Sequence, residues 1–182
     1  MGLLSYMREN QDKGNIDIST WGKFKITDLF TISGTKTTPK DKLDLDSGGE
    51  YPYITTQATN NAVAGYSAKW TEEGGVLVVD SAVIGTCTYQ EKNFTASDHV
   101  EKLTPSQHKY NWVMTKEIAL FIATIINKVG TYLAYSYGKK RSQVALMGEI
   151  IYLPTDNDGK PDFEYMHRNM KRYMSDISTL II

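Results

Sequence analysis

Residues 76–80 read VLVVD, four consecutive aliphatic side chains that end in an acid. This short run is rich in β-branched residues and follows the turn sequence EEGG (72–75), so it predicts a buried strand. A second segment, KEIALFIATIINK (116–128), is apolar nearly all round and predicts a buried helix. We therefore expect an α+β domain in which a twisted mixed or antiparallel sheet packs against a buried helix.

Further elements extend outward from these two segments. Gly85 marks a bulge or a close backbone approach, and Pro154 ends the last core strand. The expected strands are the first part of WGKFKITDLF (21–30), which continues into a turn of helix, YPYITT (51–56), VIGTCTYQ (83–90) and the strand region VALMGEIIYLP (144–154). Between them, residues 33–50 contain few apolar side chains and predict a long loop. The expected divisions are a polar lead-in (1–18), a globular domain (19–160) and a C-terminal helix (161–182).

The C-terminal segment has its own pattern, with apolar residues spaced alternately three and four apart. Asp162 is placed to cap the start of a helix. This a/d spacing favours a coiled-coil-like seam for a partner helix, and the alternative is an amphipathic helix that lies on its own domain. The seam residues are Phe163, Met166, Met170, Tyr173, Ile177 and Leu180.

Composition sets limits on the function. The 182 residues carry a formal net charge of -1, so net charge alone does not indicate a nucleic-acid binder, although a local basic patch can still supply the field. Cys87 is the single cysteine, which rules out an internal disulfide framework and favours a reducing, cytoplasmic location. The longest apolar stretch, residues 118–126, is too short to span a bilayer.

Catalytic and metal-binding patterns do not emerge from the sequence. His99, His108 and His167 lie far apart without ligand spacing. The sequence DNDG (156–159) favours a turn over a calcium loop, because its glycine comes at the fourth rather than the sixth position. Cys87 lies within a predicted strand, where a small buried side chain is favoured over a nucleophile. We therefore expect a binding protein with no catalytic residue, metal or cofactor of its own.

Three polar loops supply residue types that suit DNA. Lysines and arginine can contact phosphates, amide side chains can pair with adenine, arginine can read guanine, and tyrosines can stack. Alternation predicts that the two tyrosines of the third loop share one face. The candidate DNA-binding residues are Lys36, Thr37, Thr38 and Lys40 in the first loop, Thr56, Gln57, Asn60 and Asn61 in the second, and Tyr135, Tyr137, Lys139, Lys140, Arg141 and Ser142 in the third.

The order of these segments resembles the target-recognition domain of type I restriction–modification specificity (S) subunits and of related single-chain restriction–methyltransferases. The resemblance covers roughly residues 21–178. It rests on WGKFKITDLF, then YPYITTQATNNAVAGY, then GGVLVVDSAVIGTCTYQEKNFTASDHVEKL, and finally YSYGKKRSQVALMGEIIYLPTDNDGKPDFEYM followed by a helix. Full S subunits carry two such domains separated by long helices, and this chain has room for one domain and the start of one helix.

The resemblance implies a non-catalytic subunit that reads one half of a bipartite site in double-stranded DNA. Its helices would dock methyltransferase subunits, which bind S-adenosylmethionine and methylate adenine, and cleavage would belong to another subunit. A homodimer through the C-terminal helix is also possible. The competing hypothesis is an adaptor, such as an anti-restriction decoy, that binds methyltransferase subunits through this helix without binding DNA. A small hydrolase with a hidden pair of acids is a third alternative.

Overall fold

The computed structural model describes residues 18–43 and 48–180, so nearly all of the predicted lead-in lies outside the described residues. The helices are α2 (Lys116–Leu133), α3 (Gln143–Gly148) and α4 (Phe163–Leu180). The strands are β1 (Gly22–Lys25), β2 (Phe30–Gly34), β3 (Tyr51–Ile54), β4 (Val63–Ser67), β5 (Val76–Asp80), β6 (Cys87–Gln90), β7 (Thr95–Ala96), β8 (Val100–Pro105) and β9 (Ile150–Leu153).

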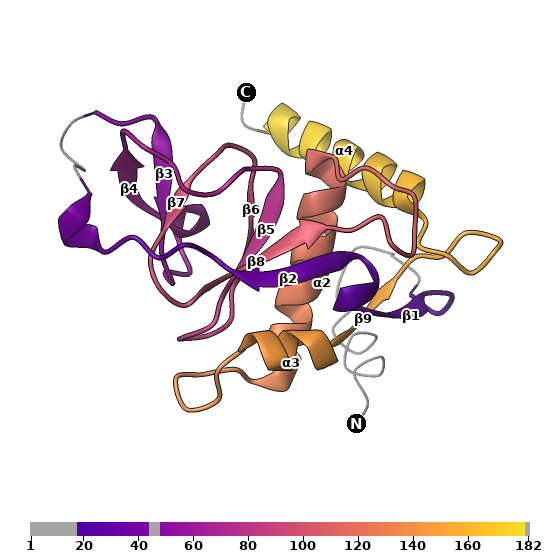
Figure 1. The fold of residues 1–182 in the computed structure, drawn as a ribbon. Helices are drawn as coiled ribbons and strands as arrows, with labels where there is room; N and C mark the ends of the chain where they lie inside the picture. The colour runs from indigo at the N-terminus through magenta and orange to yellow at the C-terminus, as the bar shows by residue number, and fades with distance from the viewer. Residues whose placement is uncertain (1–17, 44–47, 181–182) are drawn as a thin grey trace.

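The strands of the described residues form one large antiparallel sheet and two smaller ones. The large sheet has the order β2-β8-β5-β6, and the mixed sheet β4-β3-β7 contains the parallel pair β3 and β7. β1 and β9 pair antiparallel, although about 125 residues separate them in the sequence. Figure 1 shows the small mixed sheet on one side of the molecule and α2 crossing behind the large sheet. The predicted α+β class, with a mixed or antiparallel sheet and a buried helix, is confirmed.

Strand β5 joins the two hydrophobic cores because both of its faces are buried. Its side chains alternate: Leu77 and Val79 pack into the core around α2, and Val76 and Val78 pack into a second core around Phe94. Successive side chains of a strand point to opposite faces, so a strand covered on both sides must be apolar throughout. The uninterrupted sequence VLVV is the consequence of this position.

Helix α2 is the central element of the larger core. The Thr115 hydroxyl caps its start by accepting a hydrogen bond from the Ile118 amide, and Ile122 and Ile126 are fully buried. Ala134 ends the helix in the left-handed conformation, with φ of 53°. The predicted buried helix is therefore confirmed, and it continues to Leu133.

Two strand predictions were wrong in part. The segment 144–154 begins as helix α3, because the Ser142 hydroxyl accepts from the Ala145 amide and caps it, and only β9 is extended. In the segment 83–90, the strand begins at Cys87, and the residues before it form a loop. Gly85 is in the left-handed region, with φ of +73°, as its expected special backbone role requires.

The first half of the C-terminal seam packs on its own domain. Asp162 caps α4 as predicted, since its carboxylate accepts from the Tyr165 amide at 2.8 Å. Met166 is fully buried, the Phe163 ring stacks on Trp112 with centroids 4.6 Å apart, and Met170 packs against the same core. A partner seam through these three residues is therefore wrong.

The second half of the seam differs from the first. Tyr173 is half-buried and the Ile177 side chain is 58% exposed. The side chain of Leu180 lies outside the described residues. Within the part of the chain that the structure describes, no helix is long and apolar enough to cross a membrane.

Candidate nucleic-acid interface

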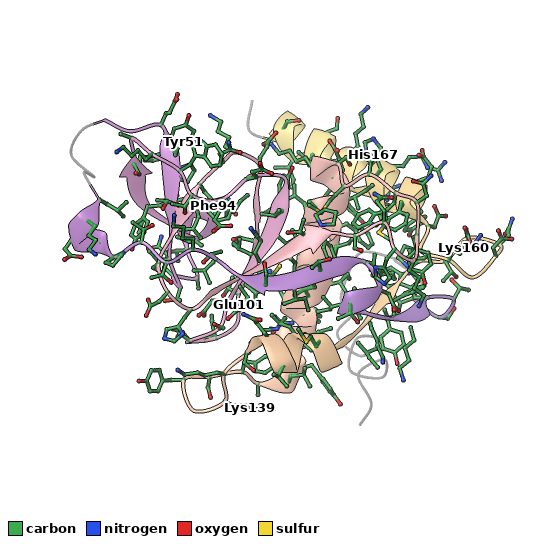
Figure 2. All side chains as sticks on the ribbon, viewed as in Figure 1. Tyr51, Phe94, Glu101, Lys139, Lys160 and His167 are labelled. Atoms are coloured by element: carbon green, nitrogen blue, oxygen red, sulfur yellow. The ribbon has the colours of Figure 1, made fainter. Side chains whose placement is uncertain are left out.

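The basic segment before α3 is a tight turn that presents three side chains to solvent. The backbones of Ser136 and Lys139 exchange two hydrogen bonds, N to O at 3.1 and 2.9 Å, and close the turn. Tyr137 at its tip is 78% exposed, and Lys139 and Lys140 are exposed beside it. The Lys140 ammonium lies 5.7 Å from the centroid of the Tyr137 ring. Figure 2 shows Lys139 on the side of the molecule away from His167 of α4.

Lys139 also completes the end of α2. Its ammonium donates to the Leu133 carbonyl at 2.6 Å, one of the last carbonyls of the helix that lack a partner within it. A cation at this position also interacts favourably with the helix dipole. Lys139 is thus held at the surface with its charge beside that of Lys140.

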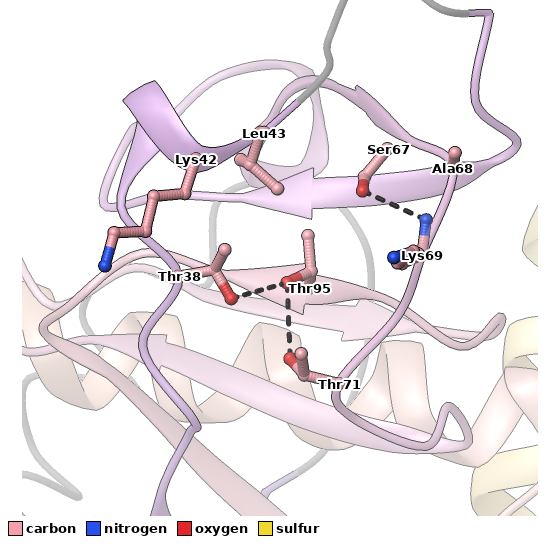
Figure 3. Close-up of a pocket in the computed structure, with 8 residues that line it drawn as sticks. All are labelled: Thr38, Lys42, Leu43, Ser67, Ala68, Lys69, Thr71 and Thr95. Carbon is pink, nitrogen blue, oxygen red and sulfur yellow. Dashed lines mark hydrogen bonds between the residues drawn. The ribbon is translucent and has the colours of Figure 1, made fainter.

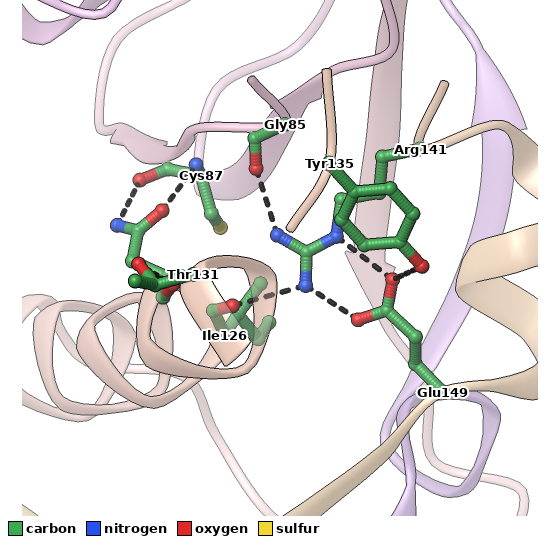
Figure 4. A network of polar contacts seen from close by, with 8 residues as sticks. Gly85, Cys87, Ile126, Thr131, Tyr135, Arg141 and Glu149 are labelled. Carbon is green, nitrogen blue, oxygen red and sulfur yellow. Dashed lines mark hydrogen bonds and ion pairs between the residues drawn. The ribbon is translucent and has the colours of Figure 1, made fainter. Parts of the chain in front are cut away.

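Arg141 is the largest correction to the predicted site. It is only 1% exposed, so it cannot be the predicted base reader. All three of its guanidinium nitrogens donate hydrogen bonds inside the protein, to the Glu149 carboxylate, to the Gly85 carbonyl at 2.7 Å and to the Ile126 carbonyl at 2.9 Å. The guanidinium therefore joins the segment of Arg141 to three others, as Figure 4 shows.

Two glycines make room for this guanidinium. A Cβ at Gly85 would lie 2.7 Å from the Arg141 Cδ, and a Cβ at Gly130 would lie 2.8 Å from its Nη1. Any larger side chain at either position would force the buried arginine out of place. Gly130 lies within α2, where alanine would otherwise be the better helix former.

Tyr135 belongs to the same buried group, which corrects the prediction that it shares a face with Tyr137. Its hydroxyl donates to Glu149 at 2.9 Å, and the Arg141 guanidinium carbon lies 5.2 Å from its ring centroid. Burial, followed by this hydrogen bond, raises the pKa of Tyr135 to about 12. Ser142 is exposed, and its hydroxyl caps α3.

The second polar loop is shaped by its own amide groups. Asn60, Asn61 and Ala62 have φ of 51°, 51° and 65°, a left-handed run that asparagine tolerates better than most residues. The Gln57 and Asn60 amides donate to the Val63 carbonyl at 2.7 and 2.8 Å.

This loop is also fixed to the large sheet. The Asn61 amide donates to the Tyr89 carbonyl of β6 at 3.0 Å, and the Gln90 amide donates to the Asn61 carbonyl. Asn60 and Asn61 remain exposed, while Thr56 and Gln57 are half-buried. The loop is therefore held in one shape with two amide side chains at the surface.

The first polar loop lies by another pocket. Lys36, Thr37 and Lys40 are exposed, and the Thr38 hydroxyl accepts a hydrogen bond from Thr95 at 3.0 Å. A pocket of about 390 Å³ lies over this contact, and Figure 3 shows its lining residues Thr38, Lys42, Leu43, Ser67, Ala68, Lys69, Thr71 and Thr95.

The second and third loops lie at one shared groove. Ala58 of the second loop, Ile84 of the β5–β6 loop and Tyr135 of the third line a groove of about 470 Å³ at the C-terminal end of α2. The first loop lines the other pocket. Gly34, the last residue of β2 before this loop, lies close to α3, since a Cβ at Gly34 would be 3.2 Å from the Gln143 amide nitrogen. The structure thus brings two of the three predicted loops together.

Cys87 and residues 156–159 lie in the surroundings that the sequence predicts for them. Burial raises the pKa of the Cys87 thiol to about 12, which keeps it neutral and unreactive at ordinary pH. Residues 156–159 form the predicted turn, in which the Asp156 carboxylate accepts from the amides of Asp158 and Lys160. Among the described residues, no three potential metal ligands gather.

Sequence reasoning missed four residues that shape this surface: Asp80, Gly130, Glu149 and Ile84. Asp80 ends a buried strand, and Glu149 is the single acid in an otherwise apolar stretch, VALMGEIIYL. An acid in such a context is a signal for a buried partner, because unpaired burial of a charge is costly. Nothing in the local sequence identifies that partner as Arg141.

Comparison with known proteins places this geometry in a family. The model of the family "Type I restriction modification DNA specificity domain" matches residues 18–178. The "Type II restriction enzyme BgcI specificity subunit S.BcgI" of Heyndrickxia coagulans is 28% identical over 183 residues, covering 93% of this chain and 51% of that relative. The chain therefore spans about half the length of this curated relative.

Solved structures show the same fold. The type I restriction–modification system S subunit from M. genitalium has a TM-score of 0.66 at 14% identity, over 94% of this chain and 42% of that one. The HsdS subunit from Thermoanaerobacter tengcongensis has a TM-score of 0.59 at 11% identity, over 98% and 43% of the two chains.

Proposed function

The chain belongs to the type I restriction modification DNA specificity domain family, and from this premise we propose that it reads one half of a bipartite site in double-stranded DNA. The observation that supports the proposal is the shared groove, which is lined by Ala58 of the second loop and Tyr135 of the third. These two segments also carry the exposed amides of Asn60 and Asn61 and the exposed Lys139 and Lys140. Amides suit bases, and lysines suit phosphates.

In this proposal the two segments that meet at the groove have different roles. Asn60 and Asn61 contact base edges, while Lys139 and Lys140 bind the DNA backbone and set the register of the protein on the duplex. The chain has a net charge of -1, so it binds DNA weakly alone and gains affinity when partner subunits wrap the duplex. The first loop, with Lys36 and Lys40, contacts a neighbouring stretch of backbone.

The chain is proposed to act without chemistry of its own. It positions methyltransferase subunits, which carry S-adenosylmethionine and methylate adenine, and a separate subunit cleaves. Because the chain spans 51% of its curated relative, the second half-site is read by a second copy or by another recognition domain.

The test is selection of bound duplexes from a randomised library. The chain is assembled with the methyltransferase subunit of its system and incubated with the library at physiological salt. We expect one short half-site to be enriched, and exchange of residues 57–61 for those of a relative should change its sequence. Assembly without enrichment of any sequence would support the DNA-inert adaptor and refute the proposal.

The exposed end of α4 is proposed to carry the contact with a partner helix, in a homodimer or with a methyltransferase subunit. Ile177 is 58% exposed and Met174 is 36% exposed, three residues apart on one side of the helix. We expect Ile177→Asp to lower the assembled fraction in size-exclusion chromatography at least tenfold. Ser175→Asp is the matched control, because two residues turn the helix by about 200° and place this charge on the other side. Equal assembly of both variants would refute this role.

A further inference from the structure

The loop between β5 and β6 presents two adjacent aliphatic side chains to solvent. Val83 is 42% exposed and Ile84 is 50% exposed, although the fully buried strand β5 ends only three residues before Val83, at Asp80. We call Val83 and Ile84 the aliphatic tip. Single exposed aliphatic residues are common on protein surfaces. Exposure alone therefore does not indicate a binding role, and the contacts around the tip have to be considered.

The backbone of the tip is held in place by a buried acid. The Asp80 carboxylate, 5% exposed, accepts hydrogen bonds from the amides of the four residues that follow its neighbour, Ala82, Val83, Ile84 and Gly85, with distances of 2.7–3.3 Å. Hydrogen bonds to an ionised carboxylate are stronger than neutral ones. Because these hydrogen bonds fix the backbone of the loop, its two aliphatic side chains cannot turn inward and stay at the surface.

A second contact fixes the tip relative to the basic turn. The Gly85 carbonyl accepts from Arg141 at 2.7 Å, and Arg141 directly follows Lys140. The buried Arg141 therefore fixes the backbone at the end of the tip, and it also anchors the segment that carries the two exposed lysines. A surface that is held in its binding conformation loses less entropy when it binds.

Ile84 of the tip lies at the groove of the proposed function, which it lines together with Ala58 of the second loop and Tyr135 of the third. A duplex that contacted both loops would lie over the tip. The two segments that meet Ile84 at the groove carry exposed lysines and exposed amides, which suit DNA better than an apolar protein surface.

One group in the major groove takes an aliphatic contact, the C5 methyl of thymine. We propose that the aliphatic tip contacts thymine methyl groups in the recognised half-site and so contributes to its sequence preference. This inference rests on the proposed function and adds the class of base that the rigid loop selects. Asp80 is a positioning residue in it.

The test replaces thymine by deoxyuridine, which removes the methyl and leaves base pairing intact. The probe is the half-site enriched from the randomised library, with each thymine replaced in turn, and the complex contains the full chain and its methyltransferase subunit. We expect one or two replacements to weaken binding about fourfold each, the equivalent of burying one methyl group. No effect at any thymine, or an enriched half-site without A·T pairs, would overturn the inference.

A variant then assigns the effect to the tip. In Val83→Ser/Ile84→Ser, the deoxyuridine penalty should disappear, because the variant binds both duplexes equally. Val113→Ser is the matched control: this valine is 77% exposed and lies before α2, at the other end of the helix from the groove. The control should keep the penalty. A tip variant that keeps the full penalty, or that loses only assembly with the methyltransferase, would overturn the inference.

The failures of the two proposals can be distinguished. If the library yields no enriched half-site, the proposed function fails and the inference falls with it. If a half-site is enriched and the wild-type complex is indifferent to deoxyuridine, the inference alone fails. The wild-type measurement decides this even if the tip variant does not fold.

Discussion

Three consecutive cations, Lys139, Lys140 and Arg141, have the same charge and opposite surroundings. The two lysines are exposed, while the arginine is 1% exposed and fully bonded within the protein. The difference comes from other segments of the chain: the space left by Gly85 and Gly130, and the acid Glu149. The comparison teaches that one basic run can combine exposed charges with a buried cation that fixes the segment carrying them.

Removing the buried cation should produce the largest effect. Arg141→Met leaves the Glu149 carboxylate, 4% exposed, without its charge partner, and breaking such a pair costs about 3–5 kcal/mol. We expect the free energy of unfolding in urea to fall by that amount. Lys140→Met is the matched control and should change it by less than about 0.5 kcal/mol.

The double variant sharpens this test. Arg141→Met/Glu149→Met removes both charges and should recover much of the lost stability, since a buried ion pair replaced by apolar side chains is often neutral. A double variant as unstable as the single one would show that the unpaired carboxylate is not the cause.

Gly130→Ala should destabilise the protein, against the usual rule. In most helix interiors this change stabilises by about 1 kcal/mol. Here the added Cβ would lie 2.8 Å from the Arg141 Nη1, and overpacking of this kind costs about 1–3 kcal/mol. Gly148→Ala is the control, because a Cβ there meets nothing within 4 Å. If thermal unfolding shows Gly130→Ala to be as stable as the control, the space around Arg141 is less constrained than described.

The smallest stability effect concerns Tyr135. Tyr135→Phe removes its hydrogen bond to Glu149 and should cost about 1 kcal/mol at neutral pH, whereas Tyr137→Phe should cost nothing measurable. The pKa of Tyr135 is raised from 10 to about 12. Its contribution is therefore complete below pH 10 and is lost as pH rises through about 12. In denaturant titrations, the difference between wild type and Tyr135→Phe should shrink over that interval. A constant difference would contradict the raised pKa.

The core elements could be predicted because each encodes its surroundings locally. Strand β5 is apolar on both faces and α2 nearly all round, and both proved buried. α3 was missed because valine and isoleucine in residues 144–151 favour a strand, while the Ser142 cap that starts the helix is a single weak signal.

The site was predicted less well, for a physical reason. Residue type indicates which groups can bind DNA, but burial depends on contacts between segments far apart in the sequence. Arg141 meets Gly85 across 56 residues. Likewise, Phe163 and Met166 follow the heptad spacing of a partner seam, and Trp112 and the core of their own domain cover them instead.

The salt dependence of DNA binding tests the division between the cations most directly. The complex with the enriched half-site is titrated between about 50 and 200 mM salt, for the wild type and for Lys139→Ala/Lys140→Ala. If both lysines contact phosphates, the slope of log K against log salt should become shallower by about 1.8, at 0.9 per contact, while the preferred sequence remains unchanged. An unchanged slope would show that the basic turn does not face DNA and would contradict the account.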